Sequence, residues 1–256
     1  MDTSNPQPLV SVVMPAYNAE RYIGEAISSV LSQTYKNWEL LILDDCSSDR
    51  TAEIAEHFVS CDTRIHLLRN PQNMGVAKTR NRGLTLAQGE WVALLDSDDV
   101  WRSDKVEKQL ALAERSRAEL VYTSYELFSS TESKIVDYYI PEKTDYSHML
   151  KENVIGCSTV MLRRSIYERF RFREDVYHED YALWLEILRH GHIAVGCTEI
   201  LTNWRISEKS RSFDKRSAAK NRWLIYRKIE NLSLLRSGCA FAAYAVHGMA
   251  KHRRVR

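Results

Sequence analysis

Short apolar runs alternate with longer segments of helical periodicity over the first 128 residues of the chain. The apolar runs have the length of strands that are buried on both faces of a sheet. They lie at Val10–Met14, Glu39–Leu43, Ile65–Arg69, Trp91–Leu95 and Leu120–Tyr125. Because strands and helices take turns, the pattern predicts an α/β fold with a mostly parallel sheet and helices on both faces.

Apolar positions between these strands recur with the period of a helix that packs by one face. In the first segment an i, i+3, i+4, i+7, i+8 pattern runs through Ile23, Ala26, Ile27, Val30 and Leu31. A second helix is predicted at about residues 54–58, a third at about 75–88 and a fourth from Asp104. Gly89 is the expected left-handed C-cap of the third helix, and Asp104 with Glu107 matches a capping box for the fourth.

The second half of the chain is less regular. Its pattern predicts a loop and edge strand over residues 129–141, a strand over 158–163 and a hairpin-like stretch that ends at Ile206. An amphipathic helix is predicted from Asp180 to His190 and is closed by Gly191. Two basic helices, at about 215–236 and 240–251, form the expected C-terminal appendage.

Composition fits one large α/β domain, since 44% of the 256 residues are hydrophobic. The five cysteines are odd in number and include no C-x-x-C pair, so neither a disulfide framework nor a zinc site is predicted. The N-terminus lacks a signal-peptide pattern, and the longest apolar run near the C-terminus, residues 239–250, is too short to span a bilayer. These features favour a protein of the reducing cytoplasm.

Charge is distributed unevenly, although the formal net charge is only +2. Residues 209–256 contain 13 Lys and Arg residues against Asp214 and Glu230, so the remainder of the chain is acidic. A basic, aromatic-bearing tail on an acidic body indicates an anionic partner. An anionic membrane surface and a nucleic acid both fit this pattern, and the tail alone does not choose between them.

Acidic residues are crowded at positions 96–99, Asp-Ser-Asp-Asp, directly after a predicted buried strand. Such carboxylates repel one another unless a cation lies among them, and Mg²⁺ or Mn²⁺ prefers their oxygens together with those of phosphates. Tyr17 and Asp44 follow two other strands, and the carboxyl ends of parallel strands meet at one ligand-binding edge. We therefore expect a metal-bound nucleotide diphosphate at this edge. The alternative is a solvated turn in which Asp99 or Ser103 caps the next helix.

Other residues of this edge have a functional and a structural interpretation. Tyr17 could stack on a nucleobase while Asp44 accepts its ring N–H, although an aromatic residue after a strand commonly serves packing. Lys78, Arg80 and Arg82 could offset a diphosphate, or they could belong to an exposed basic face of their helix, which is favoured for Arg82. Asp180 could act as a general base or cap the helix that it begins.

Several catalytic signatures are absent from the sequence. It contains no G-x-x-x-x-G-K-[ST], G-x-G-x-x-G, G-x-S-x-G or H-E-x-x-H motif, which argues against P-loop hydrolysis, dinucleotide redox chemistry, serine hydrolysis and zinc proteolysis. Phosphate binding is therefore left to a metal.

The order of motifs over residues 9–206 resembles glycosyltransferase family 2. The resemblance is carried by VSVVMPAYNAE, LLILDDCSSDRT, NMGVAKTRNRGL, GEWVALLDSDD and HEDYALWLEI. It implies a GT-A, Rossmann-like catalytic domain over residues 1–208, with a nucleotide-binding half at about 9–128 and an acceptor half at about 129–208, followed by the basic appendage 209–256. It also implies metal-dependent, inverting transfer of a hexose from a nucleotide diphosphate sugar to a hydroxyl group.

Two alternative functions remain open. A sugar nucleotidyltransferase would need a glycine-rich basic loop near the N-terminus, for which residues 15–24 are a poor candidate. The other alternative is a non-catalytic protein that binds a nucleotide sugar or nucleic acid.

Matching positions assign the donor site. By resemblance, Pro15, Ala16 and Tyr17 line the nucleoside pocket and Asp44 binds the base, commonly uracil, so we expect a UDP-sugar donor. Ser97, Lys78 and Arg80 complete the expected donor-binding set.

Matching positions also assign the metal and the base. The Asp-x-Asp pair is Asp96 and Asp98, with Asp98 in direct contact with Mn²⁺ or Mg²⁺ and Asp96 near the ribose or the metal. Asp180 becomes the general base, so the resemblance favours catalysis over capping for this residue.

One departure from the family pattern concerns the segment that folds over the diphosphate. Many relatives have Tyr-Arg followed closely by His, whereas this chain has Trp204-Arg205-Ile206-Ser207. Ser207 cannot replace an imidazole, and Lys209 and Arg211 are the candidates to close the site.

The tail resembles that of bacterial members that build O-antigen, capsule or lipopolysaccharide. The expected acceptor is therefore a saccharide on a polyprenyl diphosphate or another lipid, with no nucleic acid partner. The expected location is the cytoplasm, with the tail at the inner face of the plasma membrane. The alternative for the tail is a helix whose apolar side, Leu224, Ile225, Ile229 and Leu232, packs on the catalytic domain.

Overall fold

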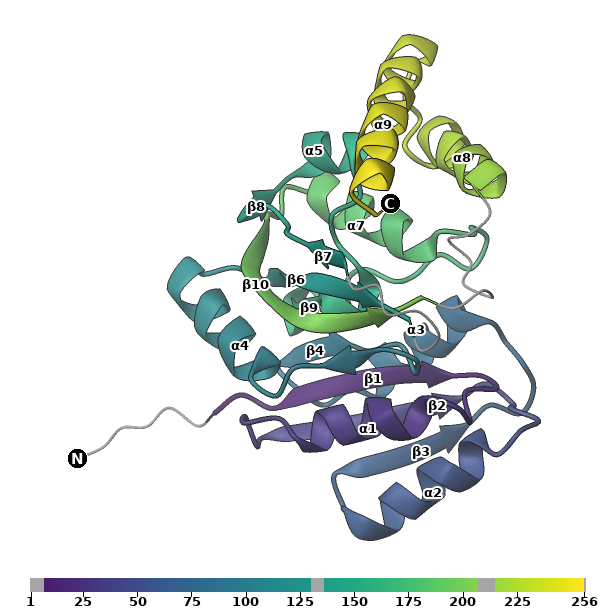
Figure 1. The fold of residues 1–256 in the computed structure, drawn as a ribbon, viewed down its shortest axis with the longest axis vertical. Helices are drawn as coiled ribbons and strands as arrows, with labels where there is room; N and C mark the ends of the chain where they lie inside the picture. The colour runs from purple at the N-terminus through teal and green to yellow at the C-terminus, as the bar shows by residue number, and fades with distance from the viewer. Residues whose placement is uncertain (1–6, 130–135, 207–214, 256) are drawn as a thin grey trace.

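A sheet of ten strands forms the centre of the computed structural model, which describes residues 7–129, 136–206 and 215–255 (Figure 1). Its strand order is β3-β2-β1-β4-β9-β6-β10-β5, with β7 paired to β6 and β8 paired to β10. The strands are β1 (Val10–Ala16), β2 (Trp38–Asp44), β3 (Ile65–Arg69), β4 (Trp91–Leu94), β5 (Val100–Trp101), β6 (Leu120–Phe128), β7 (Val136–Tyr138), β8 (Lys143–Thr144), β9 (Met161–Arg163) and β10 (Ala194–Arg205).

The first four strands are all parallel, as the alternating pattern predicts. β9 then enters antiparallel between β4 and β6, while the long strand β10 is parallel to β6. The predicted α/β fold with a mostly parallel central sheet is confirmed. The hairpin-like stretch predicted before Ile206 is wrong: it is β10, one strand with register shifts between Cys197 and Thr202.

Helices cover both faces of the sheet. They are α1 (Ile23–Leu31), α2 (Thr51–Cys61), α3 (Val76–Leu86), α4 (Lys105–Ser116), α5 (Tyr146–Lys151), α6 (Arg164–Tyr167), α7 (Glu179–Arg189), α8 (Lys215–Leu224) and α9 (Leu234–Val255). A short 3₁₀ helix, η1 (Cys157–Thr159), precedes β9, and a π-helical segment, η3 (Ile225–Ile229), follows α8. Gly191, with φ of 92°, follows the end of α7 as predicted.

Alternate residues of each strand enter two different cores, because successive side chains of a strand point to opposite faces. In β2, Leu40 and Ile42 pack in a core with α1, α2 and α4. Leu41 and Leu43 pack in the other core, with α3, α7 and part of the C-terminal segment. Burial on both faces explains the continuous apolar runs by which the sequence predicts these strands.

Two predicted helix caps are wrong. α3 ends at Leu86, and Gly89 does not take up the left-handed conformation. Glycine is instead required at position 89 because there is no space for a side chain. An added Cβ would come within 2.6 Å of the Trp91 carbonyl oxygen and 2.7 Å of the Leu9 carbonyl oxygen. Asp104 does precede α4, but its side chain makes no capping hydrogen bond and pairs with Lys108 at 2.7 Å.

Gly89→Ala is expected to lower the free energy of unfolding by about 1–3 kcal/mol, because the new methyl group meets backbone atoms that cannot turn aside. Chemical denaturation of both proteins measures this loss. Gly238→Ala is the matched control: no atom lies within 4 Å of its added Cβ and the site is inside α9, so stability should rise by up to about 1 kcal/mol. Equal stabilities for Gly89→Ala and the wild type would contradict the steric explanation.

The boundaries of the C-terminal helices differ from the prediction. The expected break falls earlier, at Asn231, whose φ of 50° is left-handed and is tolerated by Asn. α8 and η3 precede the break, and α9 then runs for 22 residues. Figure 1 places α8 and α9 beside α5 and α7, at the end of the molecule opposite α2.

Candidate active site

The carboxyl ends of β1, β2 and β4 lie side by side, because β1 pairs with both other strands. Ala16 is in register with Asp44, so Tyr17 leaves the sheet next to the end of β2. The 96–99 turn follows β4 on the other side of β1. The three strand ends that the sequence selects therefore meet at one edge of the sheet.

The predicted nucleoside side of this edge combines one exposed ring with one buried carboxylate. The side chain of Tyr17 is 52% exposed, whereas Ala16 and Asp44 are buried in the strand ends. Asp44 accepts a hydrogen bond of 3.3 Å from the Ser47 backbone N–H. An exposed ring beside a buried acceptor can hold a planar base that also donates an N–H. Pro15, also buried, completes this end of β1.

Asp45, which sequence reasoning did not select, shapes the turn before α3. Its carboxylate accepts the backbone N–H groups of Met74 and Gly75, at 2.8 and 2.9 Å, and an N–H of Asn70 at 2.7 Å. The second acid of the Asp44–Asp45 pair is therefore structural. The sequence does contain a signal for this difference. Successive side chains of an extended chain point to opposite faces, so Asp45 is expected to point away from the side to which Asp44 points.

Asp99 holds the acidic turn in place. It is 1% exposed and accepts the Ser158 hydroxyl at 2.5 Å and the Arg205 backbone N–H at 2.9 Å. The same Ser158 oxygen accepts the Asp96 backbone N–H at 3.0 Å. The third acid of the turn thus ties β4 to η1 and β10 and does not cap α4. Ser158 lies about sixty residues away in the chain, and no local pattern points to it.

Arg205 contacts the acidic turn next to Asp98: its guanidinium donates to the Asp98 backbone oxygen at 2.8 Å and pairs with Glu25 at 2.6 Å. Burial, followed by repulsion from Asp96, raises the pKa of Asp98 to about 6. A carboxylate that is costly to ionise is one that a cation would stabilise. Ser97, between the two acids, is partly exposed.

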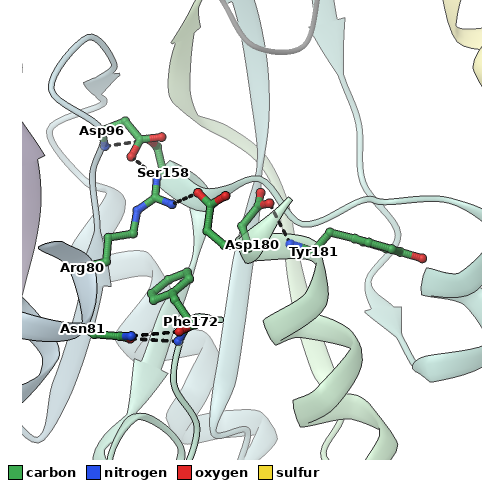
Figure 2. Close-up of polar contacts among 8 residues, drawn as sticks. Arg80, Asn81, Asp96, Ser158, Phe172, Asp180 and Tyr181 are labelled. Atoms are coloured by element: carbon green, nitrogen blue, oxygen red, sulfur yellow. Dashed lines mark hydrogen bonds and ion pairs between the residues drawn. The ribbon is translucent and has the colours of Figure 1, made fainter. Parts of the chain in front are cut away.

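Arg80 joins this turn to the start of α7. Its guanidinium pairs with Asp96 at 2.5 Å and with Glu179 at 2.8 Å, and its side chain is 4% exposed. Figure 2 shows the side chain extending toward Asp96, with Asp180 on the other side of the guanidinium. Phe172 lies below, 5.3 Å from the guanidinium carbon to the ring centre, and is fixed by two hydrogen bonds to Asn81. Arg80 is thus at the predicted edge, where it is held by two carboxylates.

Asp180 lies at the second position of α7, next to Glu179. Its carboxylate accepts the Tyr181 backbone N–H at 2.7 Å, so it satisfies one free N–H of the first helical turn (Figure 2). Burial and the neighbouring Glu179 raise the pKa of Asp180, while Arg80 acts in the opposite direction. A carboxyl with a raised pKa at such an edge has the character of a general base. The sequence assigned no role to Glu179. In the structure it pairs with Arg80 and so links the start of α7, where Asp180 lies, to Asp96.

The remaining predicted cations do not all converge. Lys78 is half exposed and lies 3.5 Å from Glu174. Arg82 donates to the Arg69 carbonyl oxygen at 2.8 Å and to Asn70. Ser207 lies outside the described residues, as do Lys209 and Arg211, the candidates to close the diphosphate site.

Arg80→Lys is expected to lower the free energy of unfolding by about 1–3 kcal/mol, because one ammonium group cannot reach both buried carboxylates in the fork geometry of a guanidinium. Thermal or chemical denaturation measures this loss. The control is Arg173→Lys, at an exposed pair with Asp175 of 2.8 Å, where we expect less than about 1 kcal/mol. Similar losses for the two variants would mean that the buried bridge contributes no more than a surface pair.

The acidic edge offers few ligands for a metal ion on its own. Within the parts of the chain described here, no three His, Cys, Asp or Glu side chains form a metal-binding group. Mg²⁺ is commonly held by one or two carboxylates together with substrate phosphates, and the Asp96–Asp98 pair offers that number of oxygen ligands. The donor set and the raised pKa of Asp98 therefore fit a hard divalent cation that arrives with a phosphate group.

Comparison with known proteins identifies the class. A model of the family described as glycosyl transferase family 2 matches residues 11–171, more than half of the chain. The chain belongs to this family, and the resemblance seen in the sequence is confirmed. It is therefore a glycosyltransferase by family.

Its relatives include enzymes of bacterial surface polysaccharides. TuaG of Bacillus subtilis, named for teichuronic acid biosynthesis, is 38% identical over 97% of this chain and 99% of its own. WfgD of Escherichia coli, named as a UDP-Glc:α-D-GlcNAc-diphosphoundecaprenol β-1,3-glucosyltransferase, is 42% identical over 84% of each chain. This chain thus resembles bacterial surface-polysaccharide glycosyltransferases.

Solved structures share the fold. TarS 1–349 of S. aureus in complex with UDP-GlcNAc matches with a TM-score of 0.73 and 19% identity, over 92% of this chain and 70% of that one. The mannosyltransferase PcManGT of Pyrobaculum calidifontis, in complex with GDP-Man and Mn²⁺, matches with a TM-score of 0.71 and 17% identity, over 97% and 76%. The likeness shows that the fold is GT-A-like, as predicted.

Proposed function

We propose that the protein transfers a hexose, with inversion, from a UDP-sugar to a hydroxyl of a lipid-linked saccharide in the synthesis of bacterial O-antigen, capsule or lipopolysaccharide. The observation that carries the proposal is the bridge through Arg80, which joins the Asp96–Asp98 turn to the Glu179–Asp180 pair. The bridge brings the residues proposed for the donor and the residue proposed for the base to one edge of the sheet. A diphosphoundecaprenol acceptor and a UDP-sugar donor in the name of WfgD support the substrate class.

The proposed donor site uses the residues at the ends of β1, β2 and β4. Tyr17 stacks on the uracil, while Asp44 accepts its ring N–H and Pro15 and Ala16 form the floor. Asp98 would hold Mn²⁺ or Mg²⁺ directly, and Asp96 would lie toward the ribose or the metal. When bound, the cation neutralises charge on the leaving diphosphate. Ser97, Lys78 and Arg80 complete the proposed donor-binding set.

Transfer then depends on Asp180. Its carboxylate accepts the proton of the acceptor hydroxyl as that oxygen attacks the anomeric carbon from the face opposite the diphosphate. The new bond forms between the acceptor oxygen and the anomeric carbon, and the bond from that carbon to the diphosphate breaks, which inverts the centre. Glu179 and Arg80 hold the start of α7 in place during this step, because both are buried and paired.

The chain divides, in this proposal, into a catalytic unit of residues 1–208 and a basic tail of residues 209–256. The nucleotide half of the unit, about 9–128, supplies the donor site, and the acceptor half, about 129–208, supplies the base. We place the enzyme at the cytoplasmic face of the plasma membrane, where a polyprenyl-linked acceptor would be presented. No helix in the described part of the chain combines the length and apolar character that crossing a bilayer requires.

A panel of nucleotide sugars with Mn²⁺ tests the proposal. Each donor is incubated with a polyprenyl-diphosphate sugar, and transfer and hydrolysis are both scored. We expect one UDP-sugar to be consumed with formation of a disaccharide, whose linkage has the opposite anomeric configuration from the donor. Tight binding of UDP with no turnover of any donor would instead support a non-catalytic binding protein.

A further inference from the structure

α9 has two different apolar faces, and only one of them packs on the protein. Ser237 and Ala240 are buried, and Phe241 packs against the main core. Arg222 of α8, itself buried, lies 4.5 Å from the ring centre of Tyr244 and 3.5 Å from that of Tyr181 in α7. These contacts fix one side of α9 to the body of the molecule.

The opposite side of α9 carries an exposed apolar row. Positions 235, 239, 242 and 246 follow one another at intervals of four, three and four residues, which places them on one face of a helix. Leu235 is 84% exposed and Val246 is 60% exposed, with Cys239 and Ala242 exposed between them. Leu234, 67% exposed, widens the row at its beginning. We call these five residues the outer face of α9.

The described tail that carries the outer face also exposes positive charge. Lys220, Lys228 and Arg236 are exposed, whereas the one acid of the described tail, Glu230, is buried. An exposed apolar row on a basic tail matches the boundary between the acyl chains and the headgroups of an anionic membrane.

The apolar side that sequence reasoning assigned to the tail does pack inward. Ile225 is 1% exposed, and Ile229 and Leu232 contact the main core. The predicted alternative, a tail helix that packs by its apolar side, is therefore correct for Ile225, Ile229 and Leu232. These contacts do not involve the outer face of α9.

We propose that the outer face of α9 is the surface that lies on an anionic bilayer. The proposal rests on the proposed function, since a lipid-linked acceptor gives the enzyme a reason to be there. Because Arg222 is held between Tyr181 and Tyr244, a docked α9 stays attached to α7, the helix that begins with Glu179 and Asp180. The acceptor half of the site is thereby oriented toward the membrane that carries its substrate.

Vesicle sedimentation tests this surface with the full chain. Vesicles of phosphatidylglycerol and phosphatidylethanolamine are compared with vesicles of phosphatidylcholine, and the bound fraction gives a partition coefficient. The double variant L235Q/V246Q keeps the charge and removes apolar contact, so we expect at least about a tenfold weaker partition into the anionic vesicles. The double variant K228Q/R236Q should weaken it about as much at low salt and little at high salt.

Matched controls separate this surface from general stickiness. Ile193 and Tyr139 are exposed apolar side chains outside the tail, at 55% and 70%, and I193Q/Y139Q should partition like the wild type. Equal partition of all variants, or no binding to anionic vesicles, would overturn the proposal. Light scattering that shows a dimer dissociated by L235Q/V246Q would also overturn it, in favour of a second copy as occupant.

The vesicle experiment is independent of the proposed reaction, because partition is measured without turnover. Conversely, transfer to a short-chain soluble acceptor should be unchanged in L235Q/V246Q.

Discussion

Asp180→Asn should lower kcat by a factor on the order of 10² to 10⁴, while the dissociation constant for UDP stays within about twofold of the wild-type value. An amide cannot take the proton of the acceptor hydroxyl, so the attacking oxygen keeps its proton and develops positive charge in the transition state. The change is close to isosteric, and an amide oxygen can still accept the Tyr181 N–H that Asp180 accepts at 2.7 Å. Initial rates of sugar transfer and a UDP titration measure the two quantities on the same preparation.

Asp175→Asn is the control, because Asp175 lies a few residues before α7 and is 67% exposed in its pair with Arg173. It should leave kcat within about twofold of the wild type. If Asp180→Asn transfers sugar as fast as Asp175→Asn, the carboxylate at position 180 is not the base, and its contact with the helix N-terminus is its whole role.

The pH dependence of the wild type follows from the same carboxylate. Burial and Glu179 raise the pKa of Asp180 above its ordinary value of 3.8. A base works when deprotonated, so kcat/KM should fall as the pH decreases through the raised pKa and should level off above it. The acidic limb contributed by Asp180 should therefore lie above pH 3.8 and should be missing from the residual activity of Asp180→Asn, which keeps only the limb of Asp98, whose pKa is about 6.

Asp98→Asn is the second change with a large expected effect, a decrease in kcat/KM by a factor of roughly 10² to 10³. The proposed contact of Asp98 with the cation supplies charge stabilisation worth several kcal/mol at the leaving diphosphate, and an amide oxygen is a much weaker ligand. Rates as a function of Mn²⁺ concentration measure the effect, and the midpoint of activation should move to higher concentration. Asp104→Asn, in the loop after β5, is the control, since Asp104 pairs with Lys108 on the surface.

Stability distinguishes this loss from unfolding. The pKa of Asp98 is raised to about 6, so the folded protein without metal disfavours the ionised carboxylate. At a pH above 6 the charge therefore lowers stability, and its removal should leave the melting temperature of metal-free Asp98→Asn equal to or above that of the wild type. A marked decrease in melting temperature would show that Asp98 supports the fold and would remove the link between the rate and the metal.

The strands of the nucleotide half could be predicted because they are buried on both faces. Such strands are continuous apolar runs, and the fully buried β4 begins at Trp91 as predicted and ends one residue early, at Leu94. The helix caps were harder. Gly89 is required by its close approach to the backbone of Leu9 and Trp91, and Asp104 pairs with Lys108, four residues later in α4, and makes no capping hydrogen bond. A glycine required by a close approach looks the same in the sequence as a glycine required by a positive φ.

The acids of the candidate site could be selected from the sequence, but their separate roles could not. Asp44 and Asp45 are adjacent and alike, and the structure gives the second one to the turn before α3. In the 96–99 turn, Asp99 is used by Ser158 and Arg205, which lie far along the chain. The partner of Arg80 at Glu179 is ninety-nine residues away. Such roles depend on which side chains the fold brings together. The periodicity of apolar residues along the sequence does not predict these long-range contacts.

The most direct measurement is a crystal structure of Asp180→Asn with Mn²⁺ and the UDP-sugar that the donor panel identifies. The substitution slows turnover, so the intact donor can be observed. The account predicts Mn²⁺ bound by Asp98 and the diphosphate, uracil between Tyr17 and Asp44, and the side chain at position 180 facing the anomeric carbon on the side opposite the diphosphate. A donor bound elsewhere, or an Asp98 side chain in solvent with neither metal nor diphosphate in contact, would contradict it.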